Sequence, residues 1–297
     1  MTYRRVLFWF VDGLGLGPPE HNPLLEAATP TFQELVGGPL CAGSLPVYRS
    51  WCAVVPLDAT LGVPGLPQSG TGQTALLAGC NAAALEGRGV PGFPSARLHT
   101  LLRERNPFSR LRARGLPVAL ANAYPASYLH DTRRPRGAFF LAAQFAGVRL
   151  RGLDDLRRGW AVAGDLTGEG LAARGHRVEV VSPEEAGRGL AALARHYTFT
   201  AFEYFALGLA SHGRWKAPVA AVLEGLDWTL GAALRELDPQ EDLLVLTSDH
   251  GGAESPQGNH TTHPVPLIAA GPGAQRLVLH CRSLADVAPA LEALLVR

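Results

Sequence analysis

One stretch of the sequence, Leu243–Ala270, constrains the fold and the chemistry of the chain more than any other. It begins with an apolar run, Leu243–Leu246, which is short enough to be a buried strand. Asp249 and His250 follow almost at once, and a second apolar run closes the stretch after a polar loop. Because ligands of open α/β sheets bind beyond the carboxyl ends of strands, these polar side chains stand where a binding site is expected.

The polar loop between the two apolar runs adds His260 and His263. Carboxylate oxygens and imidazole nitrogens together suit a divalent metal that accepts O and N ligands. The alternative is a polar turn with surface histidines, and for Asp249 and His250 alone the two interpretations are equally supported. With two more histidines in the same connection, we favour the metal site.

The composition restricts the class of protein. A length of 297 residues with 47% hydrophobic residues fits one large α/β domain or two modest ones. The net charge of +1 gives no electrostatic reason to expect nucleic acid or an anionic membrane as a partner. The four cysteines match no zinc-ligand spacing, and no apolar run approaches the ~18 residues of a membrane span. We therefore expect a cytoplasmic protein with free thiols.

Another apolar run, Val6–Val11, predicts a buried strand with Asp12 at its carboxyl end. The glycines that follow, Gly13, Gly15 and Gly17, lack the GxGxxG spacing, and two prolines stand where a helix would begin. A dinucleotide-binding loop is therefore disfavoured. A carboxylate at a strand end before a flexible loop is better suited to hold a metal.

The segment Leu57–Gly79 is rich in Gly, Ser and Thr and passes into a helix predicted over Gln73–Ala78. Ser69 and Thr71 then fall at or just before the helix N-terminus, where backbone N–H groups and the helix dipole favour negative charge. A hydroxyl at such a place ionises more easily, and a phosphate can be held beside it. The alternative is a plain N-cap, which local evidence alone favours because Ser and Thr are common caps.

Two further features lie between these segments. The loop Thr132–Gly137 carries three arginines and either contacts an anionic substrate or forms a solvated turn, of which we favour the turn. The aromatic-rich segment Thr198–Leu207 predicts a strand, and His212 follows just past its end.

Predicted strands alternate with predicted helices over the whole chain. This order predicts an α/β fold with a doubly wound, mainly parallel sheet and helices on both faces. Such a sheet can bring Asp12, Ser69, His212 and the Asp249 group to one edge. Since no histidine adjoins Ser69 as a general base, we expect divalent ions to activate its hydroxyl and to orient a phosphoryl group.

At this point the sequence resembles the alkaline phosphatase superfamily of metalloenzymes, above all the branch of cofactor-independent phosphoglycerate mutase, phosphopentomutase and small relatives. The resemblance spans nearly the whole chain and rests on VDGLG, LPQSGTGQTALLAG, SPEEAGR, FEYF…SHG, TSDHGG and HTTHPVPLI. The pair TSDHG and HTxxPVP is specific in this order and spacing, whereas VDG alone is weak. The resemblance implies a single alkaline-phosphatase-like domain over residues 1–297, in which residues 125–180 form a small lid or peripheral subdomain. Because much of the span between Gly79 and Thr198 is predicted to be core helices and a strand, we expect no large cap domain.

The resemblance also implies a role for each matching position. The implied ligands are Asp12, Asp249 and His250, with Ser69, for the first ion, and His212 and His260 for the second. Ser69 would be the nucleophile, and Thr71 is a secondary candidate for that role. His260 matches the family pattern better than His263, because the family's histidine stands four residues before the proline of PVP.

The sequence departs from the family pattern at Gly208, where the family places an aspartate ligand of the second ion. Glycine has no side chain to coordinate a metal, and Glu203 is only a weak substitute. Our hypothesis is that the protein binds the first ion well and the second weakly or not at all.

The sequence therefore predicts a metal-dependent phosphoryl-transfer enzyme, a phosphatase or phosphodiesterase that forms a phosphoserine intermediate on Ser69. Its partner would be a small phosphorylated substrate, and its cofactor one or two divalent ions, for which Mn²⁺, Zn²⁺ and Mg²⁺ fit equally. A phosphomutase is the first alternative, and a non-catalytic binding protein, because of Gly208, is the second. A sulfatase is disfavoured because no Cys or Ser stands in a CxPxR-type setting.

Overall fold

A seven-stranded sheet forms the centre of the chain in the computed structural model, which describes residues 5–296. The strand order is β2-β3-β10-β9-β1-β8-β4. The strands of this sheet are β1 (Arg5–Val11), β2 (Val47–Tyr48), β3 (Cys52–Leu57), β4 (Val118–Leu120), β8 (Phe199–Tyr204), β9 (Asp242–Thr247) and β10 (Val265–Ala270).

The sheet is mixed. Strands β4, β8, β1 and β9 are parallel neighbours, whereas β10 is antiparallel to both β9 and β3, and β2 is antiparallel to β3. The predicted α/β fold is confirmed. Parallel pairing is confined to the half of the sheet that β4, β8, β1 and β9 form. Because β3 runs in the same direction as β9, the carboxyl ends of β1, β3, β8 and β9 still meet at one edge.

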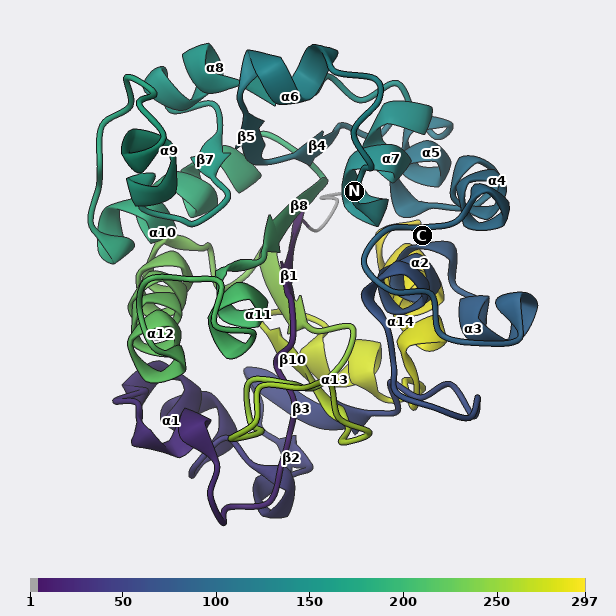
Figure 1. Cartoon of the computed structure of the whole chain (residues 1–297), viewed down its shortest axis with the longest axis vertical. Helices are drawn as coiled ribbons and strands as arrows, with labels where there is room; N and C mark the ends of the chain where they lie inside the picture. The colour runs from purple at the N-terminus through teal and green to yellow at the C-terminus, as the bar shows by residue number, and fades with distance from the viewer. Residues whose placement is uncertain (1–4, 297) are drawn as a thin grey trace.

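Helices cover both faces of this sheet (Figure 1). On one side lie α1 (Pro30–Val36), α10 (Pro183–Ala194), α11 (Ala206–Ser211) and α12 (Val219–Glu236). On the other side lie α2 (Ser69–Ala78), α4 (Ala96–Glu104), α5 (Pro107–Arg112), α7 (Ala138–Phe145), α13 (Ala274–Val278) and α14 (Val287–Leu295). The remaining helices are short: η1 (Pro23–Glu26), η2 (Ala42–Ser44), α3 (Ala82–Glu86), α6 (Ala126–His130), α8 (Leu153–Arg157), α9 (Glu169–Ala173) and η3 (Leu284–Asp286).

The alternation of side chains along β1 explains why this strand is apolar throughout. Val6, Phe8 and Phe10 pack into the hydrophobic cluster on one face of the sheet, whereas Leu7 and Trp9 pack into the cluster on the other. A strand that is buried on both faces has a continuous run of apolar residues instead of alternating apolar and polar residues. Each such side chain contributes about 1.5–3 kcal/mol when fully buried.

A second, three-stranded sheet continues from the end of β4. It consists of β5 (Asn122–Tyr124), β6 (Arg151–Gly152) and β7 (Val162–Ala163) in the order β6-β5-β7. With α6, α8 and α9 it lies at the top of Figure 1, at the opposite end of the main sheet from β2. The prediction that residues 125–180 form a lid or peripheral subdomain of a single domain stays a prediction.

Two local features differ from the sequence expectations. Helix α2 begins at Ser69 and not at Gln73, because the small residues between them fit a helix that approaches the sheet closely. Helix α11 separates β8 from His212, which is the C-cap residue of that helix and not part of a strand-end loop.

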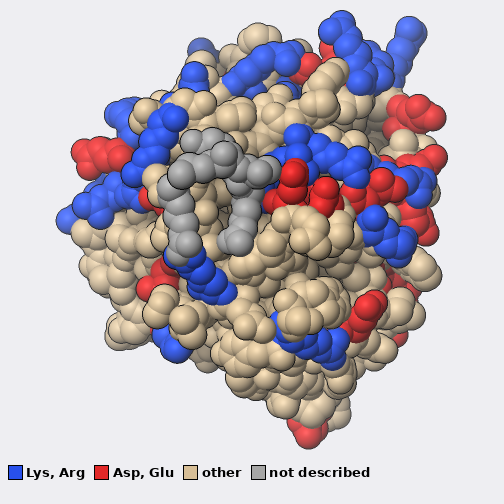
Figure 2. All heavy atoms as spheres, turned by 180° about the vertical axis from the view of Figure 1, so that it is seen from behind, with Lys and Arg blue, Asp and Glu red and all other residues tan. Residues whose placement is uncertain are grey.

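Charged side chains of both signs lie on the face of the protein that Figure 2 shows. Lys and Arg lie mostly in the upper half of this view, interspersed with Asp and Glu. Within residues 5–296, no helix is long and apolar enough to cross a membrane. The four cysteines are free, and three of them are buried.

Candidate metal centre

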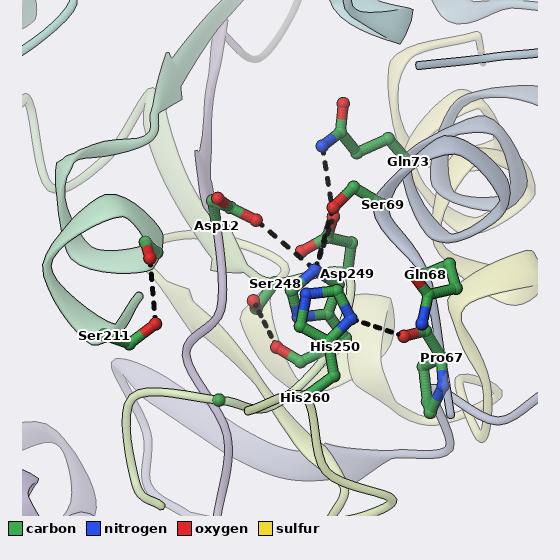
Figure 3. Close-up of polar contacts among 12 residues, drawn as sticks. Asp12, Pro67, Gln68, Ser69, Gln73, Ser211, Ser248, Asp249, His250 and His260 are labelled. Carbon is green, nitrogen blue, oxygen red and sulfur yellow. Dashed lines mark hydrogen bonds and ion pairs between the residues drawn. The ribbon is translucent and has the colours of Figure 1, made fainter. Parts of the chain in front are cut away.

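Three side chains from two neighbouring strand ends converge at the expected edge of the sheet (Figure 3). Asp12 follows β1, and Asp249 and His250 follow β9, which is hydrogen-bonded to β1 along its whole length. Each of the three offers one ligand atom, and these atoms lie within 4.8 Å of one another. The pairing of the two strands therefore fixes the distance between the carboxylates.

His250 directs one ring nitrogen at both carboxylates. Its Nε2 lies 3.5 Å from Asp12 Oδ1 and 3.6 Å from Asp249 Oδ2. Its Nδ1 lies 3.1 Å from the carbonyl oxygen of Gly251, to which it can donate a hydrogen bond. A histidine that donates through one nitrogen keeps a lone pair on the other, which is the usual state of a metal ligand. Nε2 is therefore free to bind a cation between the two aspartates.

Ser69 reaches the same nitrogen from helix α2. Its Oγ lies 2.9 Å from His250 Nε2. The N-cap of α2 is Gln68, and no side chain caps the helix, so the interpretation of Ser69 or Thr71 as a plain cap is wrong. The expectation that no histidine adjoins Ser69 is also wrong, because His250 comes from a segment 181 residues away that sequence adjacency does not reveal.

The close approach of α2 depends on a glycine. A Cβ added at Gly72 would lie 2.7 Å from the carbonyl oxygen of Asp249 and 2.9 Å from its Cβ. Any side chain at this position would therefore push the helix away from Asp249. The next residue, Gln73, donates from Nε2 to Asp249 Oδ2 at 3.1 Å and so fixes the orientation of that carboxylate.

The two carboxylates are held in an environment that opposes their negative charge. Burial raises the pKa of Asp12 to about 7, with a further contribution from the charge of Asp249, and burial likewise raises the pKa of Asp249 to about 7. The Oδ1 atoms of both residues are buried and accept no hydrogen bond from the described residues. Two carboxylates that each have a buried, unpaired oxygen, together with an imidazole nitrogen that faces both, fit a divalent cation, which would satisfy all three groups.

His260 and His212 lie beside this cluster. The His260 ring stacks on His250 with centroids 3.7 Å apart, and the His212 ring lies 5.3 Å from that of His260. His260 Nδ1 lies 2.8 Å from the carbonyl oxygen of Pro67, which leaves its Nε2 available. Burial, with the nearby His250, lowers the pKa of His260 to about 4, and burial also lowers the pKa of His212. Both rings are therefore neutral and able to act as ligands at neutral pH.

The position of Gly208 explains why this second pair lacks a carboxylate. A Cβ added at Gly208 would lie 2.1 Å from Asp12 Oδ2 and 2.6 Å from Asp12 Cγ. A side chain at this position is incompatible with the present orientation of Asp12. Among residues 5–296, the group of potential ligands that meets within 4.8 Å contains Asp12, Asp249 and His250 but neither His212 nor His260.

The secondary candidates contact other groups. The Thr71 hydroxyl donates to the carbonyl oxygen of Gln68 at 3.0 Å. His263 Nδ1 lies 3.1 Å from Oε1 of the buried Glu254. Glu203 lies within β8 and accepts a 2.6 Å hydrogen bond from the Tyr124 hydroxyl. The structure therefore places none of these three side chains in the cluster around His250.

Three residues that support the cluster do not stand out in the sequence. Gln73 lies one helical turn after Ser69, a spacing that puts both on the same face of α2 and is a usable signal. Ser248 accepts from the backbone N–H of Leu14 at 2.9 Å and donates to the carbonyl oxygen of His250 at 3.1 Å, which ties the β1 loop to the β9 loop. Glu254 gives no such signal, because its partners come from the tertiary fold.

Glu254 organises the loop between β9 and β10. Its carboxylate accepts hydrogen bonds from the backbone of Gly252 and the Thr261 hydroxyl and lies beside His263. A Cβ added at Gly15 would lie 2.3 Å from this carboxylate. A glycine is therefore needed at this position of the GLGLG segment because the buried Glu254 carboxylate lies close to it, and not because a phosphate binds there.

Comparison with known families agrees with the metal-binding character of the cluster. Residues 178–296 match the family described as the Metalloenzyme superfamily. This segment of the chain is therefore similar to a metalloenzyme superfamily domain. The matched segment contains four of the expected ligands: His212, Asp249, His250 and His260.

Curated relatives that match part of this chain are phosphomutases. A 2,3-bisphosphoglycerate-independent phosphoglycerate mutase of Cereibacter sphaeroides is 33% identical over 123 residues, which cover 38% of this chain and 24% of the relative. A phosphopentomutase of a Chelativorans species is 43% identical over 81 residues, covering 27% of this chain and 20% of the relative. The matches thus span about a quarter of the length of these relatives.

Solved structures show a similar fold over nearly the whole chain. A protein from Pyrococcus horikoshii superposes with a TM-score of 0.58 at 16% identity and covers 99% of this chain and 97% of that one. The alkaline phosphatase of the Antarctic bacterium TAB5 superposes with a TM-score of 0.53 at 14% identity, covering 99% and 98%. The fold is therefore alkaline phosphatase-like, as the sequence motifs indicate.

Proposed function

We propose that the protein is a metal-dependent phosphoryl-transfer enzyme, a phosphatase or phosphodiesterase with Ser69 as its nucleophile. One observation carries the proposal: the Ser69 hydroxyl and the carboxylates of Asp12 and Asp249 all face the same nitrogen of His250, at 2.9, 3.5 and 3.6 Å. The superfamily match and the phosphomutase relatives support phosphoryl transfer as the reaction class.

Asp12, Asp249 and His250 would hold the ion, with Ser69 beside it. A divalent ion bound there lowers the pKa of a hydroxyl and neutralises charge on the phosphoryl oxygens. The orphaned oxygens of the two aspartates support this assignment, since they accept no hydrogen bond from the described residues. Mn²⁺, Zn²⁺ and Mg²⁺ all fit this set of O and N ligands.

The other residues position the reacting groups. Ser69 is the first residue of α2, so the helix N-terminus favours a phosphoryl group next to its hydroxyl. Ser69 Oγ would form a bond to phosphorus as the bond between phosphorus and the leaving-group oxygen breaks, and the serine proton would end on that leaving-group oxygen. Water would then attack the phosphoserine, the bond between phosphorus and Ser69 Oγ would break, and one proton of the water would return to Oγ as phosphate departs. Gln73 holds Asp249 in place through both steps.

The same geometry argues against a Ser-His-Asp triad. In a triad the base accepts from serine through one ring nitrogen and donates to a carboxylate through the other. Here serine and both carboxylates face Nε2, while Nδ1 faces the carbonyl oxygen of Gly251. One nitrogen cannot perform both tasks, so His250 is better suited to coordination than to general-base catalysis.

The second ion is proposed to bind weakly or not at all. His212 and His260 offer two imidazoles, and Gly208 leaves no room for the missing carboxylate while Asp12 keeps its orientation. We therefore expect one tightly held ion per chain. Elemental analysis of the purified protein tests this expectation, and two tightly held ions per chain would contradict it.

Replacement of the nucleophile tests the proposal. Ser69→Ala should reduce hydrolysis of p-nitrophenyl phosphate and its bis-ester by more than about 1000-fold while metal affinity stays within about threefold, since the hydroxyl carries the reaction. Thr71→Val is the matched control, because its hydroxyl contacts the backbone and should be dispensable. Activity retained in Ser69→Ala would refute the assignment of the nucleophile.

Two alternatives lead to different outcomes in the same assays. A phosphomutase, favoured by the names of the relatives, would return the phosphoryl group to its substrate, and product analysis with a sugar phosphate identifies it. A non-catalytic binding protein, favoured by Gly208, would hydrolyse neither ester with Mn²⁺, Zn²⁺ or Mg²⁺.

A further inference from the structure

A cavity of about 290 Å³ lies between the start of α4, the loop that follows α6, and α7. Its volume is close to that of the smallest ligand-binding pockets. Phe93, Leu129 and Leu141 supply apolar walls, and Thr132, Arg134 and Arg136 supply polar ones. The cavity is therefore suited to a small organic molecule that also carries a polar group.

One wall of this cavity adjoins Gly70, the residue that follows the proposed nucleophile. Phe93 belongs to a segment that packs on the first turn of α2: the backbone N–H of Gly70 donates to the carbonyl oxygen of Val90 at 2.9 Å. A Cβ added at Gly70 would lie 2.8 Å from the carbonyl oxygen of Phe93. Since Gly70 follows Ser69 directly, the segment that lines the cavity contacts the residue next to the nucleophile. Helices α4 and α7 also pack against α2.

The two arginines of the cavity have different roles. Arg136 is buried, donates to the carbonyl oxygens of Tyr128 and Asp131, and lies over the Tyr128 ring at 4.0 Å, so it holds the loop in shape. Arg134 is 57% exposed and makes one contact, from Nε to Asp131 Oδ2 at 3.1 Å. Its two terminal nitrogens donate no hydrogen bond within residues 5–296 and are free to bind a ligand.

The charge around the cavity favours an anion. No carboxylate lines it, and the charged side chains that do are Arg134 and Arg136. The segment that contains all the lining residues, residues 93–144, has nine arginines and two acidic residues, a net charge of +7 in a chain whose total is +1. A concentration of one sign of charge at a cavity raises the local concentration of the opposite ion.

We propose that this cavity binds the part of the substrate that is not transferred, and that Arg134 pairs with a second anionic group on it. The group would be a carboxylate or a second phosphate, both of which match the planar guanidinium. The proposal rests on the proposed function and specifies its substrate class: a phosphate ester whose leaving group is itself anionic. The loop Thr132–Gly137 is then a substrate contact and not only a solvated turn.

A pair of isosteric substrates tests this proposal. 4-Carboxyphenyl phosphate and 4-carbamoylphenyl phosphate differ in one negative charge, and we expect the metal-loaded protein to favour the carboxylate by about fivefold or more in kcat/KM. Arg134→Gln should bring this ratio close to one. Arg133→Gln is the matched control, because it removes the same charge from an exposed neighbour that does not line the cavity and should keep the ratio.

A binding measurement separates this proposal from the proposed function. Calorimetry with Ser69→Ala reports the affinity for both compounds without turnover, and 1,4-phenylene bisphosphate distinguishes a phosphate-specific from a carboxylate-specific site. Equal affinity for the charged and neutral compounds, or an Arg134→Gln variant that keeps the discrimination, would overturn the substrate proposal even if hydrolysis proceeds. Absence of hydrolysis together with discrimination in binding would overturn only the catalytic proposal.

Discussion

Two buried acidic clusters in this protein look alike by charge and differ in geometry. Asp12 and Asp249 form one, and Glu203 with Tyr124 forms the other. Burial raises the pKa of all three carboxyl groups to about 7, and each carboxylate has one oxygen that accepts no hydrogen bond from the described residues. Judged by protonation and burial alone, either cluster would qualify as a functional site.

The difference lies in what the free oxygens face. Around His250, three ligand atoms from two strand ends converge within 4.8 Å. Around Glu203, a phenol donates at 2.6 Å, and Gly137, at the start of α7, lies next to the free oxygen. Protonation removes the charge of Glu203, and no group of ligand atoms that could hold a cation is found around it among the described residues. Convergence of ligand atoms, more than an altered pKa, therefore distinguishes the candidate metal centre from the Glu203 cluster.

The largest expected effect comes from removing one carboxylate from each cluster. Asp249→Asn should weaken binding of the ion by more than about 100-fold and reduce activity by about 1000-fold or more, since it removes a ligand. Glu203→Gln should change the ion affinity less than about twofold. Titration calorimetry with Mn²⁺ or Zn²⁺ and phosphatase assays measure both, and equal losses in the two variants would erase the distinction between the clusters.

A smaller effect is expected from pH. The raised pKa values mean that Asp12 and Asp249 hold protons in the ion-free folded chain below about pH 7, and an ion must displace them. The affinity for the ion should fall on the order of 100-fold from pH 8 to pH 6, since two carboxylates must ionise. Glu203→Gln should show the same pH profile. A profile that is flat over this range would contradict ligation by these two groups.

The same raised pKa values determine whether the folded, ion-free chain becomes more or less stable as pH rises. The folded, ion-free chain retains protons that the unfolded chain releases between about pH 4 and pH 7, so its stability falls as pH rises through this window. A bound ion reverses the trend, and the gain in melting temperature on adding 100 Kd of ion should approach about 5 °C at a pH near 8.

The smallest expected effect comes from replacing a glycine beside each of the two clusters with alanine. A Cβ at Gly208 would lie 2.1 Å from Asp12 Oδ2, whereas a Cβ at Gly137 would lie 3.7 Å from Glu203 Oε2. Gly208→Ala should therefore displace Asp12 and weaken ion binding about tenfold, and Gly137→Ala should leave it unchanged. Calorimetry of both variants decides, and an undisturbed ion affinity in Gly208→Ala would refute the role given to this contact.

The sequence could locate the strand-end ligands because their signals are local. Apolar runs predict β1 and β9, and a polar residue directly after such a run predicts a side chain at the edge of the sheet, which holds for Asp12 and Asp249. The start of α10 was equally predictable, because Ser182, Pro183 and Glu185 form a capping box that depends only on neighbours in the sequence.

The supporting contacts could not be predicted in the same way. The direction of β10 is not encoded in its apolar run, since parallel and antiparallel buried strands have the same periodicity. The partners of Glu254 and His263 depend on how the loop folds back on β1, and so His263 contacts an acid instead of joining the other histidines. Such contacts follow from tertiary packing and not from spacing.

The antiparallel direction of β10 has a consequence for where the sequence of this protein can accept insertions. Residues 248–264 leave the sheet from β9 and return to it in the adjacent, hydrogen-bonded strand, so both ends of the connection are held in neighbouring positions. Residues inserted into this connection need not disturb the spacing of β1 and β9, which sets the distance between the carboxylates. Specificity can then diverge through the loop that carries His260 while the aspartates of the candidate metal centre stay fixed.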